Sequence, residues 1–209
     1  MVVERSTTVV VVTWNSAEHI QDFLRGIPDA MDGAGRWHVV VVDNDSSDGT
    51  AELARSAGIE VSVVSTGRNA GYAAGINAGI DASPDCDGYL FLNADVRLAP
   101  SCVAELWRAV EFPNCGIAVP RLVDESQRLQ WSLRREPRVG RTLGEALLGG
   151  RRAGRYGPLG EIVTNVDDYA LDHTVDWATG AASLVTAECV DRVGRWDESF
   201  FLYSEETDY

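Results

Sequence analysis

The sequence has no lysine, only four cysteines and no long apolar run. All 18 basic residues are arginine, against 32 Asp and Glu, so the formal net charge is −14. A nucleic-acid-binding surface needs a basic face, so this excess of acid argues against a general binder of nucleic acid. A single nucleotide or diphosphate is still compatible with it, because a few cations, backbone N–H groups or a metal ion suffice to hold one.

The cysteines and the first residues indicate a reducing compartment, and the short apolar runs argue against a membrane span. Cys86, Cys102, Cys115 and Cys189 form no CxxC pair, and the first residues lack the apolar stretch of a signal peptide. The longest strand-like apolar run, residues 9–12, is far shorter than the ~20 residues that span a bilayer. We therefore expect a cytoplasmic protein, with any membrane contact peripheral and at the inner face of the membrane.

Strand and helix signals alternate through the first 120 residues. Apolar, β-branched runs predict strands at residues 8–13, 37–42, 59–64, 89–92 and 116–119, and again at 181–185. Stretches with helical periodicity follow, at about residues 20–27, 50–57, 72–82, 101–112 and 187–193. Near-continuous valine runs indicate strands buried on both faces. The predicted fold class is therefore α/β, with a central, mostly parallel sheet flanked by helices.

Local signals mark the ends of these helices. Asn15 and Glu18 have the spacing of a capping box before the first helix. Ser47 or Asp48 is expected to cap the second helix, and Gly58 to end it. The third helix is rich in Gly and Ala, which predicts close packing against the sheet.

Ligands of open parallel sheets bind at the carboxyl ends of the strands. The polar segments at those ends are residues 13–15 (TWN), 43–45 (DND), 66–71 (TGRNAG) and 93–95 (NAD). We expect them to converge on one crevice. A dinucleotide-binding Rossmann domain or a sugar-nucleotide pyrophosphorylase would need a glycine-rich loop after the first strand. Residues 13–18 contain no glycine, which weakens both interpretations.

Carboxylates at these strand ends suit a nucleoside diphosphate. Asp43 can accept a charge-assisted hydrogen bond from the imide N–H of a uracil-type or thymine-type base. With Asp45 it would also suit a turn that merely caps the next helix. Asp95 can offer a carboxylate to Mg²⁺ or Mn²⁺ bridging two phosphates. Arg68 could cover the base or a phosphate, or be an ordinary surface residue.

Five segments, in order along essentially the whole chain, resemble family 2 glycosyltransferases. They are VVVVDNDSSDGT (39–50), RNAGYAAGINA (68–78), LFLNADV (90–96), WATGAASLV (177–185) and VGRWDESFFLYSEETDY (193–209). The resemblance implies the GT-A fold, a Rossmann-like fold of nucleotide-diphospho-sugar transferases. LQWSLRREP (129–137), followed by the block from Trp177, most resembles bacterial rhamnosyltransferase-like members that act in cell-wall or surface polysaccharide assembly.

The resemblance also implies a role for each matching residue. The donor nucleotide would be bound by Thr13, Trp14, Asn15, Asp43, Arg68 and Asn69. A divalent cation, Mg²⁺ or Mn²⁺, would be held on the donor diphosphate by Asp95 and Asn93. The acceptor side would be shaped by Trp177, Gly180, Ala181 and Glu205.

The pair Glu205 and Glu206 falls on the Glu-Asp motif of this family, whose second carboxylate is the expected general base. We therefore expect one inverting displacement with Glu206 as base. Asp208 is the reserve candidate, because Glu205 and Asp208 are three residues apart and share a helix face while Glu206 points elsewhere. The acidic cluster could instead be only a helix N-terminus favoured by the dipole. The sequence departs from the family at Asn93, where many members have Asp, and at Glu206, where most have Asp.

The implied function is transfer of a sugar from a UDP- or dTDP-linked donor to a hydroxyl of a sugar or lipid-linked sugar, with no nucleic-acid partner. We expect one domain over residues 1–209, with a nucleotide-sugar-binding half (1–120) and an acceptor-side half (121–209). Family members usually continue further, so we expect a C-terminal portion to be missing after Tyr209. From a different class, a non-catalytic nucleotide-sugar-binding or interaction module that keeps the fold stays open.

Charge is unevenly distributed, with a net of −9 over residues 1–120, +5 over 121–160 and −10 over 161–209. The basic excursion is expected to carry a short hairpin or helix. It offers a lipid diphosphate or an anionic membrane surface seven arginines, namely Arg134, Arg135, Arg138, Arg141, Arg151, Arg152 and Arg155. The other interpretation is a solvated loop neutralised by acidic neighbours. His19, His38 and His173 show no metal-ligand spacing and are expected to be structural or surface residues.

Overall fold

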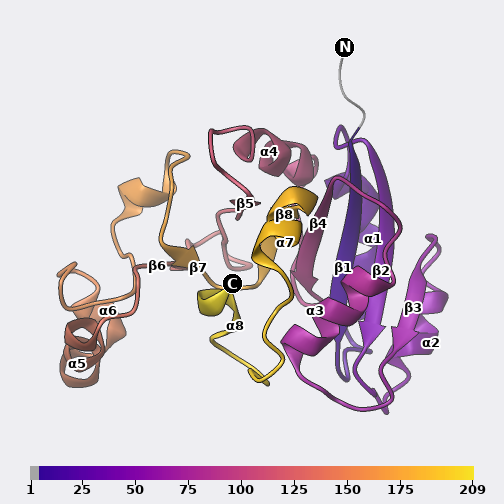
Figure 1. The fold of residues 1–209 in the computed structure, drawn as a ribbon, viewed down its shortest axis with the longest axis horizontal. Coiled ribbons are helices and arrows are strands. Elements are labelled where there is room, and N and C mark those ends of the chain that lie inside the picture. The colour runs from indigo at the N-terminus through magenta and orange to yellow at the C-terminus, as the bar shows by residue number, and fades with distance from the viewer. Residues whose placement is uncertain (1–4) are drawn as a thin grey trace. The chain divides into compact units, whose positions relative to one another are not determined.

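The computed structural model describes residues 5–209 (Figure 1). The chain forms two compact units. The first contains the residues up to Val119 together with Gly180–Tyr209, and the second is Pro120–Thr179. The segment Gly180–Tyr209 therefore folds with the amino-terminal part of the chain and not with the arginine-rich excursion.

A six-stranded sheet in the order β3-β2-β1-β4-β8-β5 forms the centre of the first unit. Its strands are β1 (Ser6–Thr13), β2 (Arg36–Asp43), β3 (Ser62–Ser65), β4 (Gly88–Asn93), β5 (Ile117–Ala118) and β8 (Ala182–Thr186). The first four strands pair in parallel, whereas β8 runs antiparallel to both β4 and β5. The predicted α/β fold with a mostly parallel sheet is confirmed.

Alternate valines of β1 fill two separate cores, one on each face of the sheet. Val9 and Val11 pack with α1 (Ile20–Ala30), α2 (Thr50–Arg55) and α4 (Cys102–Ala109). Val10 packs on the other face with α3 (Tyr72–Asp81) and α7 (Ala187–Val193), which Figure 1 shows running along the sheet. Burial on both faces explains why the strand sequence is an unbroken apolar run and not an alternating one.

The start of α1 differs from the expectation. His19 is the N-cap residue, and no side chain caps the helix. The capping box predicted for Asn15 and Glu18 is wrong, because the side chain of Asn15 is used elsewhere. Its Oδ1 accepts the backbone N–H of Ser47 at 2.9 Å, which ties the loop after β1 to the loop after β2.

Asp48, and not Ser47, contacts the start of α2. Its Oδ1 accepts the backbone N–H of Thr50 at 3.1 Å, while Gly49 occupies the N-cap position. Oδ2 of the same carboxylate accepts the N–H of Ala17 at 2.9 Å. Asp48 therefore also connects the loops after β1 and β2.

Two glycines allow α3 to lie close to the sheet. A Cβ at Gly75 would stand 2.5 Å from Cγ1 of Val12, and a Cβ at Gly79 would collide with the side chain of Val10. The close packing predicted from the Gly- and Ala-rich sequence is confirmed. Because α3 follows β3 in a parallel arrangement, its first residue, Tyr72, lies near the carboxyl ends of the strands.

The C-terminal segment of the first unit is held on α3 and ends in α8 (Glu205–Asp208). Asn77 of α3 donates to the carbonyl of Trp196 at 2.9 Å and accepts its N–H at 3.1 Å. The backbone N–H of Tyr72 donates to the carbonyl of Phe201 at 3.0 Å. These contacts fix the chain just before the acidic residues of α8.

The second unit contains a two-stranded antiparallel sheet of β6 (Leu133–Arg134) and β7 (Trp177–Ala178). Its helices are α5 (Val139–Leu148), α6 (Gly150–Ala153) and the short 3₁₀ helix η1 (Val166–Tyr169). The buried hydroxyl of Tyr169 donates to the carbonyl of Val163 at 2.9 Å and accepts the N–H of Leu133 at 3.1 Å. The helix expected in the excursion is confirmed. Within residues 5–209, no helix has the length and apolarity required to cross a bilayer.

Candidate active site

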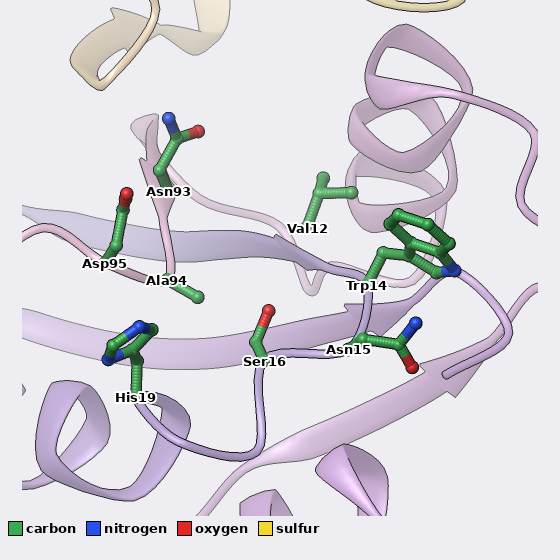
Figure 2. A pocket seen from close by; sticks show the side chains of 8 residues that line it. All are labelled: Val12, Trp14, Asn15, Ser16, His19, Asn93, Ala94 and Asp95. Carbon is green, nitrogen blue, oxygen red and sulfur yellow. The ribbon is translucent and has the colours of Figure 1, made fainter. Parts of the chain in front are cut away.

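A pocket of about 310 Å³ opens at the carboxyl ends of β1 and β4 (Figure 2). It is lined by Val12, Trp14, Asn15, Ser16, His19, Asn93, Ala94 and Asp95. Val12 and Asn93 are paired in the sheet, which brings the loop after β1 against the loop after β4. Asp95 and His19 lie at one side of the pocket and Trp14 at the other (Figure 2). The pocket therefore has polar groups at one end and an aromatic face at the other.

The polar end of this pocket offers three possible metal ligands of different chemistry. Asp95 supplies a carboxylate, Asn93 an amide oxygen and His19 an imidazole. In the part of the chain that the structure describes, no group of three or more His, Cys, Asp or Glu could hold a metal ion. A donor set of this kind fits a cation that takes most of its ligands from a diphosphate and water, as Mg²⁺ does at phosphates.

Asp43 ends β2 beside Thr13, its register partner in β1. The Asp43 side chain is 5% exposed, and its Oδ2 accepts the N–H of Ser46 at 3.3 Å. Its Oδ1 is buried and has no hydrogen-bond partner within residues 5–209. A buried acceptor without a partner is costly, so this oxygen suits an N–H supplied by a ligand. Thr13 is already used within the sheet, because its hydroxyl donates to the carbonyl of Val42 at 3.2 Å.

The loop before α3 is tied to the end of β2. The Thr66 hydroxyl bonds to Oδ1 of Asn44 at 3.1 Å, and Nδ2 of Asn44 donates to the carbonyl of Gly71 at 2.9 Å. Oδ1 of Asn69 accepts the N–H of Gly71 at 3.1 Å, so Asn69 shapes this loop. Arg68 is exposed at its tip.

Two of the four strand ends line this pocket. The loops after β1 and β4 line the pocket, whereas Thr13, Asp43, Arg68 and Asn69 do not. The segments after β2 and β3 are joined to each other by the hydrogen bond from the Thr66 N–H to the carbonyl of Asp43 at 3.0 Å.

The side chain of Glu206 is held by Gly180, the first residue of the C-terminal segment of the first unit. Its Oε1 accepts the backbone N–H of Gly180 at 2.9 Å, and a Cβ at Gly180 would stand 2.5 Å from that oxygen. The Tyr72 hydroxyl donates to the carbonyl of Gly180 at 3.3 Å. Residues from α3, α8 and the turn before β8 therefore meet at this glycine.

Burial changes the titration of the groups around Glu206. Burial raises the pKa of the Glu205 carboxyl above its usual value, and the negative charge of Glu206 raises it further. Glu205 is 4% exposed, and its Oε2 lacks a partner within residues 5–209. Burial likewise raises the pKa of the Tyr72 hydroxyl, with the charges of Glu206 and Glu205 adding to the effect, so Tyr72 stays a proton donor at neutral pH. Asp208 is exposed.

The remaining acceptor-side residues divide between the two units. Ala181 accepts the backbone N–H of Asn93 at 3.1 Å, which joins it directly to the end of β4. Trp177 belongs to the second unit, where its indole N–H donates to the carbonyl of Arg135 at 3.1 Å. The guanidinium of Arg134 lies 5.9 Å from the centre of the same ring.

Sequence comparison decides the family. Residues 8–160, which include the whole lining of the pocket, match Glycosyl transferase family 2. The chain belongs to glycosyl transferase family 2. The family expected from the five sequence segments is thereby confirmed.

Relatives of this family 2 chain cover nearly all of it. N-acetylglucosaminyl-diphospho-decaprenol L-rhamnosyltransferase of Mycobacterium tuberculosis is 28% identical over 96% of this chain and 67% of the relative. The mannosyltransferase PcManGT of Pyrobaculum calidifontis, in complex with GDP-Man and Mn²⁺, has a TM-score of 0.64 at 18% identity, covering 99% of this chain and 51% of that one. S. aureus TarS in complex with UDP has a TM-score of 0.62 at 16% identity, covering 97% and 53%. These structures show that the fold is GT-A. The chain spans about half to two thirds of the length of these proteins.

Sequence reasoning gives no site role to two residues that lie beside candidate site residues in this family 2 chain. His19 lines the pocket, although its lack of ligand spacing led to the expectation of a structural or surface role. Its place in the turn between the first strand and the first helix is the signal that could have found it. From sequence, Tyr72 is only the first residue of the helix predicted over residues 72–82. Its contact with Gly180 joins residues 108 positions apart, and no local pattern reports such a contact.

Proposed function

We propose that this family 2 member is an inverting glycosyltransferase that moves a sugar from a UDP- or dTDP-linked donor to a hydroxyl acceptor in cell-envelope glycan assembly. The observation that carries the proposal is the pocket at the carboxyl ends of β1 and β4, with Trp14 at one side and Asp95 at the other. On neighbouring β2, the buried and unpartnered Oδ1 of Asp43 adds an acceptor that a nucleobase can satisfy.

The nucleotide is recognised at the ends of β1 and β2. Oδ1 of Asp43 accepts the imide N–H of a uracil-type or thymine-type base. Trp14 is 58% exposed and offers a flat apolar face to the base or the ribose. The exposed Arg68 closes the loop over the nucleotide, and Thr13, Asn15 and Asn69 hold the surrounding backbone. The UDP in the TarS complex supports a uridine diphosphate as ligand.

A divalent cation, Mg²⁺ or Mn²⁺, accompanies the donor diphosphate. Asp95 and Asn93 hold it, with His19 beside them in the pocket. When bound, the cation supplies Lewis-acid stabilisation of the charge on the leaving diphosphate. The Mn²⁺ in the PcManGT complex supports the choice of metal.

Glu206 acts as the general base. The N–H of Gly180 holds Oε1, which leaves Oε2 to take the proton of the acceptor hydroxyl. A single displacement with inversion requires the base and the leaving diphosphate to act from opposite sides of the anomeric carbon, and this is the arrangement that we propose. Gly180, Ala181 and Glu205 of the first unit shape the acceptor side.

The acceptor is a sugar or a lipid-linked sugar. The M. tuberculosis relative is named for an N-acetylglucosaminyl-diphospho-decaprenol substrate, which supports a lipid-linked acceptor. A water-soluble donor and a lipid-linked acceptor can meet only at a membrane surface. We therefore place the reaction in the cytoplasm, at the inner face of the membrane.

The experiment is a transfer assay with UDP- and dTDP-hexoses and a lipid-linked N-acetylglucosaminyl diphosphate acceptor. Glu206→Gln keeps an oxygen for the Gly180 N–H but removes the base, so kcat should fall about 10²- to 10⁴-fold with the donor KM little changed. Asp208→Asn tests the reserve candidate for the base in the same helix, and it should keep its kcat because Asp208 is exposed. Product NMR should show an inverted anomeric configuration. Full activity of Glu206→Gln, or a retained configuration, would refute this mechanism.

A further inference from the structure

An exposed apolar stripe runs along α5 in the second unit. Val139, Leu143 and Leu147 are 79%, 59% and 82% exposed. They are spaced four residues apart, so they lie on one side of the helix. Exposed apolar surface of this kind in a folded protein marks a site of interaction.

The opposite side of α5 is fixed to the rest of the second unit. Oε1 of Glu145 accepts the backbone N–H of Glu161 at 2.8 Å. Gly144, the buried residue of the helix, stands against the backbone of Leu159, where a Cβ would collide. The apolar stripe is therefore held outward by a defined anchor on the other side of the helix.

The arginines of the basic excursion, residues 121–160, differ in their hydrogen-bond and ion-pair partners. Arg134, Arg135 and Arg141 donate to backbone carbonyls of the second unit. Arg138 pairs with Glu136 at 2.9 Å. Four others are exposed and form no ion pair or side-chain hydrogen bond within residues 5–209. One is Arg121, and the other three, in or just after α6, are Arg151, Arg152 and Arg155. They follow the apolar stripe directly along the chain, and the helices α5 and α6 lie side by side (Figure 1).

We propose that this α5–α6 surface, made of the apolar stripe and the three unpaired arginines, docks the second unit on an anionic lipid bilayer. The apolar side chains enter the boundary between headgroups and acyl chains, and the arginines meet lipid phosphates. The proposal holds for any donor and any acceptor of the enzyme.

The charge of the α5–α6 surface favours an anionic bilayer over a second copy of the chain as its binding partner. A protein with a net charge of −14 is repelled by an anionic membrane unless its contact surface is locally basic. The three unpaired arginines next to the stripe supply that basic surface. A second copy of this chain packed symmetrically on the same surface would bring the two arginine clusters together, which like-charge repulsion opposes.

The test is co-sedimentation with vesicles of phosphatidylcholine alone and of phosphatidylcholine mixed with phosphatidylglycerol. The protein should bind the anionic vesicles, and added salt should weaken the binding. Changing Arg151, Arg152 and Arg155 together to Ser should lower the partition coefficient about 100-fold, roughly fivefold for each residue. Leu143→Ser with Leu147→Ser should lower it at least about tenfold, because less apolar area is buried.

Matched controls come from exposed residues outside the α5–α6 surface. Val166→Ser with Leu171→Ser, and the triple change of Arg25, Arg36 and Arg97 to Ser, should bind like the unmodified protein. Equal binding to neutral vesicles, no effect of salt, or equal losses in the control variants would each overturn the proposal. Dimerisation that the Leu143 and Leu147 changes abolish, without any vesicle binding, would assign the surface to a second copy of the chain and overturn it as well.

Discussion

Two buried carboxylate oxygens in residues 5–209 lack a hydrogen-bond partner, and they belong to Asp43 and Glu205. Each such group costs about 1–3 kcal/mol of stability. Both stand where the sequence motifs place the donor base and the acceptor. A ligand that donates hydrogen bonds to these oxygens would therefore remove the free-energy cost of burying them without a partner. Glu206 differs from both residues, because its Oε1 already accepts the backbone N–H of Gly180.

Glu205 gives a pH-dependent prediction. Its carboxyl pKa is raised above the usual 4.5 by burial, so the folded state holds the proton to higher pH than the unfolded state does. The stability that this proton contributes is present below pH 4.5 and is lost as pH rises through the folded-state pKa. Glu205→Gln removes the loss, so the variant should gain stability over the unmodified protein as pH rises toward neutrality.

Urea unfolding from pH 4.5 to neutral measures this difference directly. Glu60→Gln is the control, because Glu60 is exposed and its side chain forms no hydrogen bond or ion pair within residues 5–209, so the substitution should leave the free energy of unfolding close to that of the unmodified protein. If the difference in the free energy of unfolding between Glu205→Gln and the unmodified protein did not change with pH, burial would not raise the pKa of Glu205.

Among the elements, α3 connects the sheet to the C-terminal segment. Its glycines pack against Val12 and Val10, while the backbone N–H of Tyr72 and the side chain of Asn77 bind the segment that leads to Glu206. A displacement of α3 should therefore reach both the nucleotide pocket and the proposed base.

Gly75→Ala tests this role of α3. The new Cβ would stand 2.5 Å from Cγ1 of Val12, which lines the pocket, so we expect a loss of about 1–3 kcal/mol of stability and weaker nucleotide binding. Gly26→Ala in α1 is the matched control, because within residues 5–209 no atom beyond its chain neighbours and the adjacent helix backbone lies within 4 Å of the Cβ position, and it should gain about 0.5–1 kcal/mol. Urea unfolding and nucleotide titration measure both effects. Equal stabilisation by the two substitutions would contradict the account.

The identity of the longer elements could be predicted from sequence, because burial on both faces leaves a plain signal in the valines of β1 and β2. The direction of β8 could not, since an apolar run shows a strand but not which way it runs. The two-residue strands β6 and β7 are too short to have a period. The capping box predicted at Asn15 does not form, because the Asn15 side chain accepts a hydrogen bond from the backbone N–H of Ser47, which is distant in sequence.

At the scale of the whole molecule, the family followed from ordered segments spread along the chain, and the match over residues 8–160 confirms it. The closeness of site residues did not follow in the same way. The pocket joins the ends of β1 and β4, and its lining includes His19, whose neighbours are set by the folded chain. The total charge of −14 also conceals the three unpaired arginines of the α5–α6 surface.

Calorimetric titration with UDP and dTDP, each with and without Mn²⁺, tests the central claim most directly. We expect at least one nucleotide to bind in the presence of Mn²⁺, and the affinity to fall at least about tenfold without the metal or in Asp95→Ala. Asp172→Ala, an exposed residue of the second unit, should bind like the unmodified protein. No binding of either nucleotide with Mn²⁺ present would contradict the account.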